Sequence, residues 1–181
     1  MEAISIFSLL GLYIGIRLLL GHHKTPEMKD REKYREGVRL VYANRFEEAR
    51  DYFTKVIEKN PQSGLAWTFR GEANYRLGNL YQCIADCSRA TKIDYTLRNS
   101  YLFKGMALYD LGEYQEAIPE LDMAIWQFRE KHPETFRYRG LCFYALGQTQ
   151  KARQDLHKAQ ARGDEEANYL LMRLYKKHDV L

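Results

Sequence analysis

The 181-residue chain contains little cysteine, little proline and little net charge. Three cysteines at distant or helical spacings do not make a disulfide framework, and four prolines with twelve glycines leave little room for long linkers. A net charge of +4 is too mild a surplus to indicate a duplex-DNA binder, which concentrates positive charge in a patch. Tyrosine is abundant instead, with 14 residues beside 8 Phe and 2 Trp.

Motifs of enzyme chemistry are also missing from the sequence. There is no glycine-rich phosphate loop, nucleophile elbow or HExxH pattern. Cys83, Cys87 and Cys142 fall at helical positions that suit buried thiols, and a zinc site would need further ligands nearby. The five histidines share no ligand spacing. We therefore predict a protein that is not an enzyme, with no catalytic residue, no cofactor and no metal site.

One long apolar run occupies residues 3–20, and nothing comparable follows it. As a helix it rises roughly 27 Å, close to the hydrocarbon thickness of a bilayer. Its Leu, Ile and Phe residues favour insertion into a bilayer by about 5 kcal/mol, which exceeds the roughly 2.5 kcal/mol that Arg17 would cost at the bilayer centre. Arg17 is also near enough to the end of the run for its guanidinium to reach the headgroups. A cleaved signal peptide and a buried soluble helix are the alternatives, and both are disfavoured by the flanks and by the lack of a polar face. The run predicts a transmembrane helix.

Charges beside this run predict its orientation. No Lys or Arg precedes it, whereas Lys24, Lys29 and Arg31 follow closely. The positive-inside rule then places the N-terminus outside and the rest in the cytoplasm, at either a bacterial inner membrane or an organellar one. The short linker and helix start at 21–29 would hold the following domain against the membrane surface.

Small residues line one face of the predicted membrane helix. These are Ser8, Gly11 and Gly15, and the Gly-x-x-x-Gly spacing suits close contact with another membrane helix. The alternative is that glycine is simply common in spanning helices.

The remainder of the chain repeats with a period of about 34 residues. Gly37, Gly71, Gly105 and Gly140 are spaced 34, 34 and 35 apart. Three further columns keep this register: Asn44, Gly78, Gly112 and Gly147; Ala49, Cys83, Ala117 and Ala152; and Val56, Ala90, Ala124 and Ala159. The first of these columns suits the left-handed turn that ends a helix, and the other two suit close helix packing.

This pattern resembles the tetratricopeptide repeat. The resemblance rests on the aromatic-x-x-x-Gly segments at 67–71, 101–105 and 136–140, on Leu-Gly-x-Tyr-x-x-Ala at 111–117, and on Asn60-Pro61. It covers residues 30–166 and implies four helix pairs, at 30–63, 64–97, 98–132 and 133–166, in a right-handed superhelical solenoid. The chain departs from the family where Leu usually precedes each glycine, with Glu36, Arg70, Lys104 and Arg139 at those positions.

A further helix is predicted at 165–178. Asp164 can cap its start, and an apolar stripe follows at Ala167, Leu170, Leu171 and Leu174. Such a helix would bury the exposed end of the stack. The predicted fold is therefore all-α, with one N-terminal transmembrane helix, four tetratricopeptide helix pairs and a C-terminal capping helix.

Aromatic columns on the first helix of each pair are the candidate binding site. The resemblance implies that these helices line a concave groove. The groove residues would be Phe69, Tyr75, Leu102, Phe103, Met106, Tyr109, Tyr138, Leu141 and Tyr144. Tyrosine suits recognition because it offers a large contact area with a polar tip. The alternative interpretation is that these rings pack between neighbouring repeats.

Some members of the family hold chaperone C-termini with a clamp of Lys and Asn side chains. The corresponding positions here are Tyr34, Val38 and Phe69, so this resemblance predicts no clamp. The groove instead suits an amphipathic helix or an extended apolar peptide.

The sequence thus predicts a membrane-anchored scaffold for protein–protein interaction, an accessory or assembly subunit whose partner is a membrane protein or a membrane-associated complex. The alternative is an adaptor whose groove captures a soluble protein or an apolar peptide, with the anchor used only for localisation. Single-stranded RNA is a disfavoured ligand, because the chain is nearly neutral and has no continuous basic groove. The oligomeric state and the partner's identity stay open.

Overall fold

The computed structural model describes Leu12 and residues 32–175 of the chain. The chain divides into two compact units, residues 1–35 and 36–181. None of the helices in the described part combines the length and the apolar character needed to cross a bilayer. The predicted membrane helix at 3–20, with its contact face of Ser8, Gly11 and Gly15, and the linker at 21–29 lie outside the described residues, apart from Leu12.

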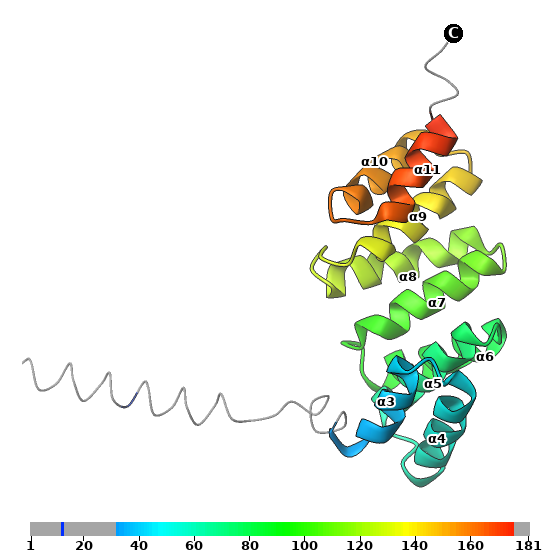
Figure 1. Ribbon diagram of the computed structural model, residues 1–181, viewed down its shortest axis with the longest axis vertical. Coiled ribbons are helices and arrows are strands. Elements are labelled where there is room, and N and C mark those ends of the chain that lie inside the picture. The colour runs from blue at the N-terminus through cyan, green and yellow to red at the C-terminus, as the bar shows by residue number, and fades with distance from the viewer. Residues whose placement is uncertain (1–11, 13–31, 176–181) are drawn as a thin grey trace, which may run out of the picture. The chain divides into compact units, whose positions relative to one another are not determined.

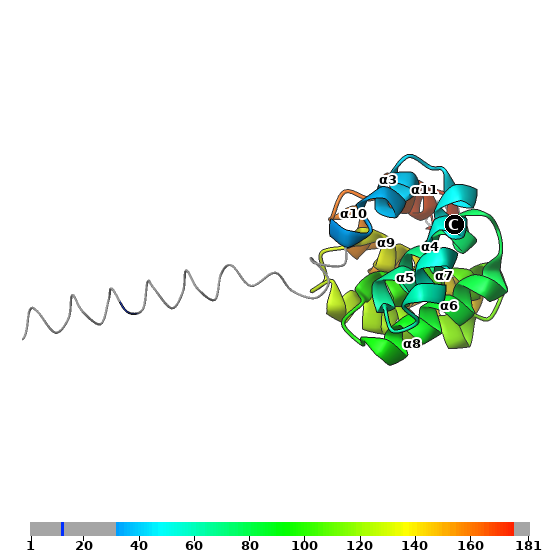
Figure 2. The same ribbon diagram turned by 90° about the horizontal axis from the view of Figure 1, so that it is seen from below.

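Nine α-helices and no strand make up the described part of the chain from residue 35 onward. The helices are α3 (Arg35–Tyr42), α4 (Phe46–Lys59), α5 (Gly64–Arg76), α6 (Leu80–Ile93), α7 (Arg98–Asp110), α8 (Tyr114–Gln127), α9 (Pro133–Ala145), α10 (Thr149–Gln160) and α11 (Glu165–Tyr175). From α4 onward each helix packs on the next, and α7 also contacts α5 and α9. Figure 1 shows these helices stacked in chain order, and Figure 2 views the same stack from below.

Left-handed residues end the first helix of each pair. Gly78, Gly112 and Gly147 have φ angles of 77°, 83° and 74°. Asn44 occupies the equivalent place in the first pair with φ 58°. A residue without a Cβ, or with a short polar side chain, tolerates this region best. The predicted turns are therefore confirmed.

The small columns form the contact between paired helices. Ala49, Cys83, Ala117 and Ala152 have no exposed surface, and neither have Ala90, Ala124 and Ala159. Val56, at the first position of the latter column, is only partly buried. Close approach also explains the glycines of the first helices, because a Cβ on Gly105 would lie 2.7 Å from Leu121 Cγ.

Helix α11 covers the end of the last pair. Asp164 Oδ1 accepts a hydrogen bond from the Ala167 backbone N–H at 2.9 Å, as expected of an N-cap residue. Ala167 and Leu171 are buried in a cluster with Phe136 and Leu156, and Leu170 and Leu174 pack against it. The last three residues of the predicted cap, 176–178, lie outside the described residues, and the repeat boundaries stay predictions.

Candidate protein-binding surface

The predicted groove residues divide into a buried group and a partly exposed group. Phe69, Leu102, Phe103 and Met106 expose at most 5% of their surface and belong to the core. Phe69 stacks on Phe53 of α4 with ring centroids 5.3 Å apart. These four side chains hold neighbouring helices together, so for them packing between repeats is the interpretation that the structure favours.

The second group lies at the edge of this core, on the first helices of three successive pairs. Tyr75 of α5, Tyr109 of α7, and Tyr138 and Leu141 of α9 are half-buried. Tyr144, at the end of α9, is 42% exposed. We call Tyr75, Tyr109, Tyr138 and Tyr144 the tyrosine strip.

Ring contacts join the tyrosine strip across three helices. Tyr75 and Phe103 have ring centroids 5.7 Å apart, and Tyr109 meets Tyr138 edge to face at 5.4 Å. The hydroxyl oxygens of Tyr75 and Tyr138 lie 3.3 Å apart, although the two residues are 63 positions apart in the chain. Tyr75, Tyr109 and Tyr138 thus form one continuous aromatic surface across α5, α7 and α9, and Tyr144 lies one to two turns further along α9.

The hydroxyls of Tyr75 and Tyr109 stay protonated at neutral pH. Burial raises the pKa of Tyr75, and hydrogen bonding to Tyr138 and to Asp110 raises it further. Burial also raises the pKa of Tyr109. The surface therefore offers neutral hydroxyl groups and ring edges, and its nearest fixed charges include Arg137, which lies over the Tyr138 ring and pairs with Asp164 at 2.9 Å. Such a surface suits apolar and aromatic side chains.

The cysteines carry no nucleophilic chemistry. All three are free, fully buried thiols, as predicted. Hydrogen bonding to Cys83 and burial raise the pKa of Cys87, and burial raises the pKa of Cys142 to about 12. In the described part of the chain, no group of His, Cys, Asp and Glu is arranged to hold a metal ion.

Sequence reasoning missed a series of ion pairs between the two helices of the second, third and fourth pairs. Arg70 binds Asp86, Lys104 binds Glu120 and Arg139 binds Asp155, with N–O distances of 2.6, 2.7 and 2.7 Å. The signal was present, because each basic residue stands just before a column glycine and each acid follows 16 residues later. Cations at a position that the family fills with Leu need an acidic partner, which is buried at Asp86 and Asp155 and partly buried at Glu120.

The stacked helix pairs define a helical-repeat fold. The chain belongs to the tetratricopeptide repeat family, whose model matches residues 34–91 and 102–167. Modules of this family bind other proteins and are not enzymes.

Two curated relatives each match less than half of the chain. The chain is 35% identical to the protein SGT1 homolog of Oryza sativa subsp. japonica over 78 residues, and these residues make up 43% of this chain and 21% of that protein. It is also 35% identical over 80 residues to Hsc70-interacting protein 1 of Drosophila melanogaster, which is 44% of this chain and 21% of that protein. These matches span about a fifth of each relative.

Among solved structures, a thermophilic TPR protein of Thermus thermophilus is similar in fold. It superposes with a TM-score of 0.66 at 23% identity, over 81% of both chains. This likeness concerns the fold alone.

Proposed function

We propose that this protein is an adaptor whose tyrosine strip captures an apolar segment of a protein partner. The observation that carries the proposal is the continuity of half-exposed, neutral tyrosine rings from α5 to α9. Aromatic side chains that are partly exposed yet held in place by ring contacts lose little entropy on binding, which makes them effective contacts.

The relatives bear on the kind of partner. The fly relative is named for its interaction with Hsc70. In this chain the positions of the family's carboxylate clamp carry Tyr34, Val38 and Phe69. Val38 and Phe69 have no polar donor in their side chains, and Tyr34 carries no charge and is only 3% exposed. The proposed ligand of the strip is therefore an amphipathic helix or extended apolar segment and not an acidic chaperone tail.

The apolar run at residues 3–20 supports a membrane location for this adaptor. We infer from it a single-pass protein with the repeats in the cytoplasm, and a partner at the same membrane makes the protein a scaffold for a membrane complex. Carbonate washing of isolated membranes tests the anchor, since release of the chain into the supernatant contradicts it. Replacing residues 3–20 with an unrelated spanning helix separates the two roles: a pure adaptor keeps its partner.

Comparative purification tests the strip. The full chain, its Tyr144→Ala and Tyr109→Ala variants and a Tyr81→Ala control are isolated from gently solubilised membranes, and co-purifying proteins are quantified by mass spectrometry. Tyr81 is a suitable control because it lies on α6, outside the strip, and is 74% exposed. Loss of a contact tyrosine typically costs about 2 kcal/mol, so a genuine partner should bind roughly 30-fold more weakly to the strip variants. Equal recovery with Tyr144→Ala and Tyr81→Ala contradicts the proposal.

A further inference from the structure

The connection between α8 and α9 differs from the other connections between pairs. It spans residues 128–132, whereas the others span 60–63, 94–97 and 161–164. The extra residue is the one that lengthens the spacing from Gly105 to Gly140 to 35. The longer connection contains two successive non-glycine residues in the left-handed region, Arg129 with φ 51° and Glu130 with φ 57°.

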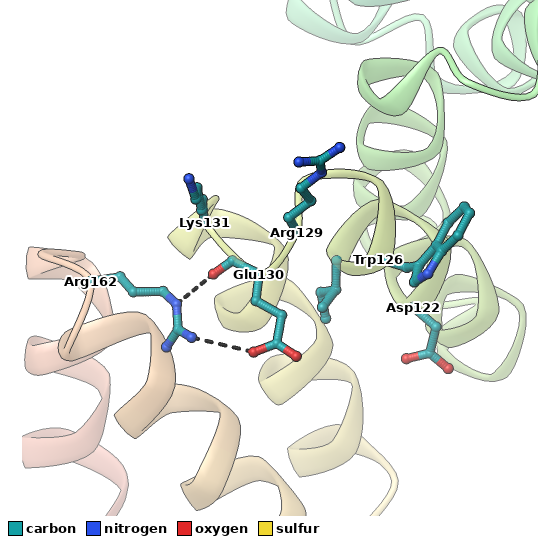
Figure 3. A pocket seen from close by; sticks show the side chains of 7 residues that line it. Asp122, Trp126, Arg129, Glu130, Lys131 and Arg162 are labelled. Carbon is teal, nitrogen blue, oxygen red and sulfur yellow. Dashed lines mark hydrogen bonds and ion pairs between the residues drawn. The ribbon is translucent and has the colours of Figure 1, made fainter. Parts of the chain in front are cut away.

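Left-handed backbone at a residue with a Cβ costs roughly 1–2 kcal/mol, and such strain persists only where the surroundings hold it. Here the backbone N–H of Glu130 donates to the Ile125 carbonyl at 2.9 Å, and that of Arg129 donates to the Trp126 carbonyl at 3.0 Å. Arg162, in the connection between α10 and α11, donates to the Glu130 carbonyl and pairs with the Glu130 carboxylate (Figure 3). The strained turn is therefore held by backbone hydrogen bonds to α8 on one side and by the Arg162 side chain on the other.

This turn forms the wall of a cavity of about 810 Å³. Its lining residues are Asp122, Ile125, Trp126, Arg129, Glu130, Lys131 and Arg162. The Trp126 side chain is 65% exposed, which is unusual for so large an apolar group. The cavity thus presents an indole face to solvent.

The charges of the cavity are unevenly compensated. Asp122 pairs with Arg139 at 2.6 Å, and Glu130 pairs with Arg162 at 3.5 Å. Arg129 and Lys131 are exposed and form no ion pair with any residue that the structure describes. In Figure 3 both side chains project from the turn to the same side, away from the carboxylates of Asp122 and Glu130.

We propose that this cavity, which we call the loop pocket, binds an acidic segment of a protein partner. Carboxylates of that segment would pair with Arg129 and Lys131, and one of its apolar side chains would lie on the Trp126 indole. A single-stranded nucleic acid fits less well, because only one aromatic face is offered for base stacking. The loop pocket shares no residue with the tyrosine strip, so it is a second interaction site.

A designed peptide tests the loop pocket directly. The probe is fluorescein-labelled Gly-Asp-Asp-Phe-Asp-Asp-Gly, added to the full chain in a mild detergent and followed by fluorescence anisotropy. Control peptides replace every Asp with Lys, or the Phe with Ala. We expect the acidic peptide to bind, the basic one not to bind, and the Phe-to-Ala peptide to bind several-fold more weakly. Binding of the acidic peptide should weaken as salt is raised.

Arg129→Gly is the decisive variant. Glycine relieves the left-handed strain at this position, so the variant folds at least as well as the original chain, while it removes one of the two uncompensated charges. We expect about tenfold weaker binding, as for the loss of one charge-assisted contact of about 1.4 kcal/mol. Lys131→Gln and Trp126→Ala should weaken binding similarly, whereas Lys55→Gln on the exposed face of α4 and Tyr81→Ala on α6 should not.

Three outcomes overturn the proposal: equal binding of acidic and basic peptides, equal affinity of Arg129→Gly and Lys55→Gln, or displacement of the peptide by single-stranded DNA or by phosphatidylserine vesicles at lower concentration than by unlabelled peptide. The Tyr144→Ala variant should bind the acidic peptide normally. Failure of the loop pocket and failure of the tyrosine strip are therefore distinguishable.

Discussion

Replacement of Arg70 by leucine tests whether the buried ion pairs hold the helix pairs together. The guanidinium donates from Nε to Asp86 Oδ2 at 2.9 Å and from Nη2 to Asp86 Oδ1 at 2.6 Å. The Asp86 side chain is only 5% exposed, and that of Arg70 is 20% exposed. Arg70→Leu introduces the residue that the family usually has at this position, so a steric clash is not expected.

The magnitude follows from the carboxylate that is left behind. Removing one partner of a buried pair costs about 3–5 kcal/mol, because the remaining charge is uncompensated. Asn74 Nδ2 still donates to Asp86 at 3.0 Å, so we expect the lower end, about 3 kcal/mol. At a urea slope of about 2 kcal/mol per molar, the unfolding midpoint should fall by roughly 1.5 M.

The assay is urea unfolding of the full chain, followed by far-UV circular dichroism. Two further variants sharpen it. Arg70→Leu with Asp86→Asn removes both charges and should recover most of the lost stability. Arg39→Leu is the matched control, because Arg39 makes the same two-fold contact with Glu36, but with both side chains more than half exposed. A midpoint for Arg70→Leu no lower than that for Arg39→Leu would refute the reasoning.

Two other changes probe packing and pH. Gly105→Ala places a Cβ 2.7 Å from Leu121 Cγ, so the cost of overpacking should exceed the gain in helix propensity by about 1–2 kcal/mol and lower the Tm by about 3–6 °C. The control Gln115→Ala, on the exposed side of α8, should leave the Tm unchanged. An unaltered Tm for Gly105→Ala would argue against the close approach of the two helices. Burial lowers the pKa of His132 below its usual 6.5, and its Nδ1 atom has no hydrogen-bond partner in the described part of the chain. The folded protein then binds fewer protons than the unfolded chain, so stability is full above pH 6.5 and falls as the pH drops through that value toward the folded pKa. The loss of Tm from pH 7.5 to pH 5.5 should be smaller in His132→Phe, and an identical loss excludes His132 as its cause.

The repeat columns made much of the fold predictable from the sequence, because one physical requirement recurs at each position. A left-handed turn recurs at Gly78, Gly112 and Gly147, and a contact too close for a larger side chain recurs at Ala49, Ala117 and Ala152. A packing or turn requirement that recurs in four repeats produces a column of similar residues within this one sequence.

The candidate site was less predictable, because exposure depends on how far each residue lies from the neighbouring helix. Phe103 and Tyr138 occupy equivalent places in successive repeats, yet Phe103 is 5% exposed and Tyr138 is half-buried. Phe103 belongs to the buried core cluster with Leu102 and Met106, whereas Tyr138 only packs against the edge of that cluster. A spacing in the sequence cannot register whether an equivalent side chain lies inside a cluster or at its edge.

We therefore expect the departures from the repeat pattern to be the places where this chain selects a partner differently from others with the same fold. Columns that all repeats share must satisfy the same packing, so they cannot select one partner over another. Selection needs residues that the fold does not demand, such as the inserted residue that places Arg129 and Glu130 in a strained turn beside an exposed tryptophan. Deleting one residue from the 128–132 connection separates these roles. Because the other connections fold at the shorter length, the deletion should preserve the stack and abolish binding of the acidic peptide, and retention of that binding would show that the strained turn is not what shapes the loop pocket.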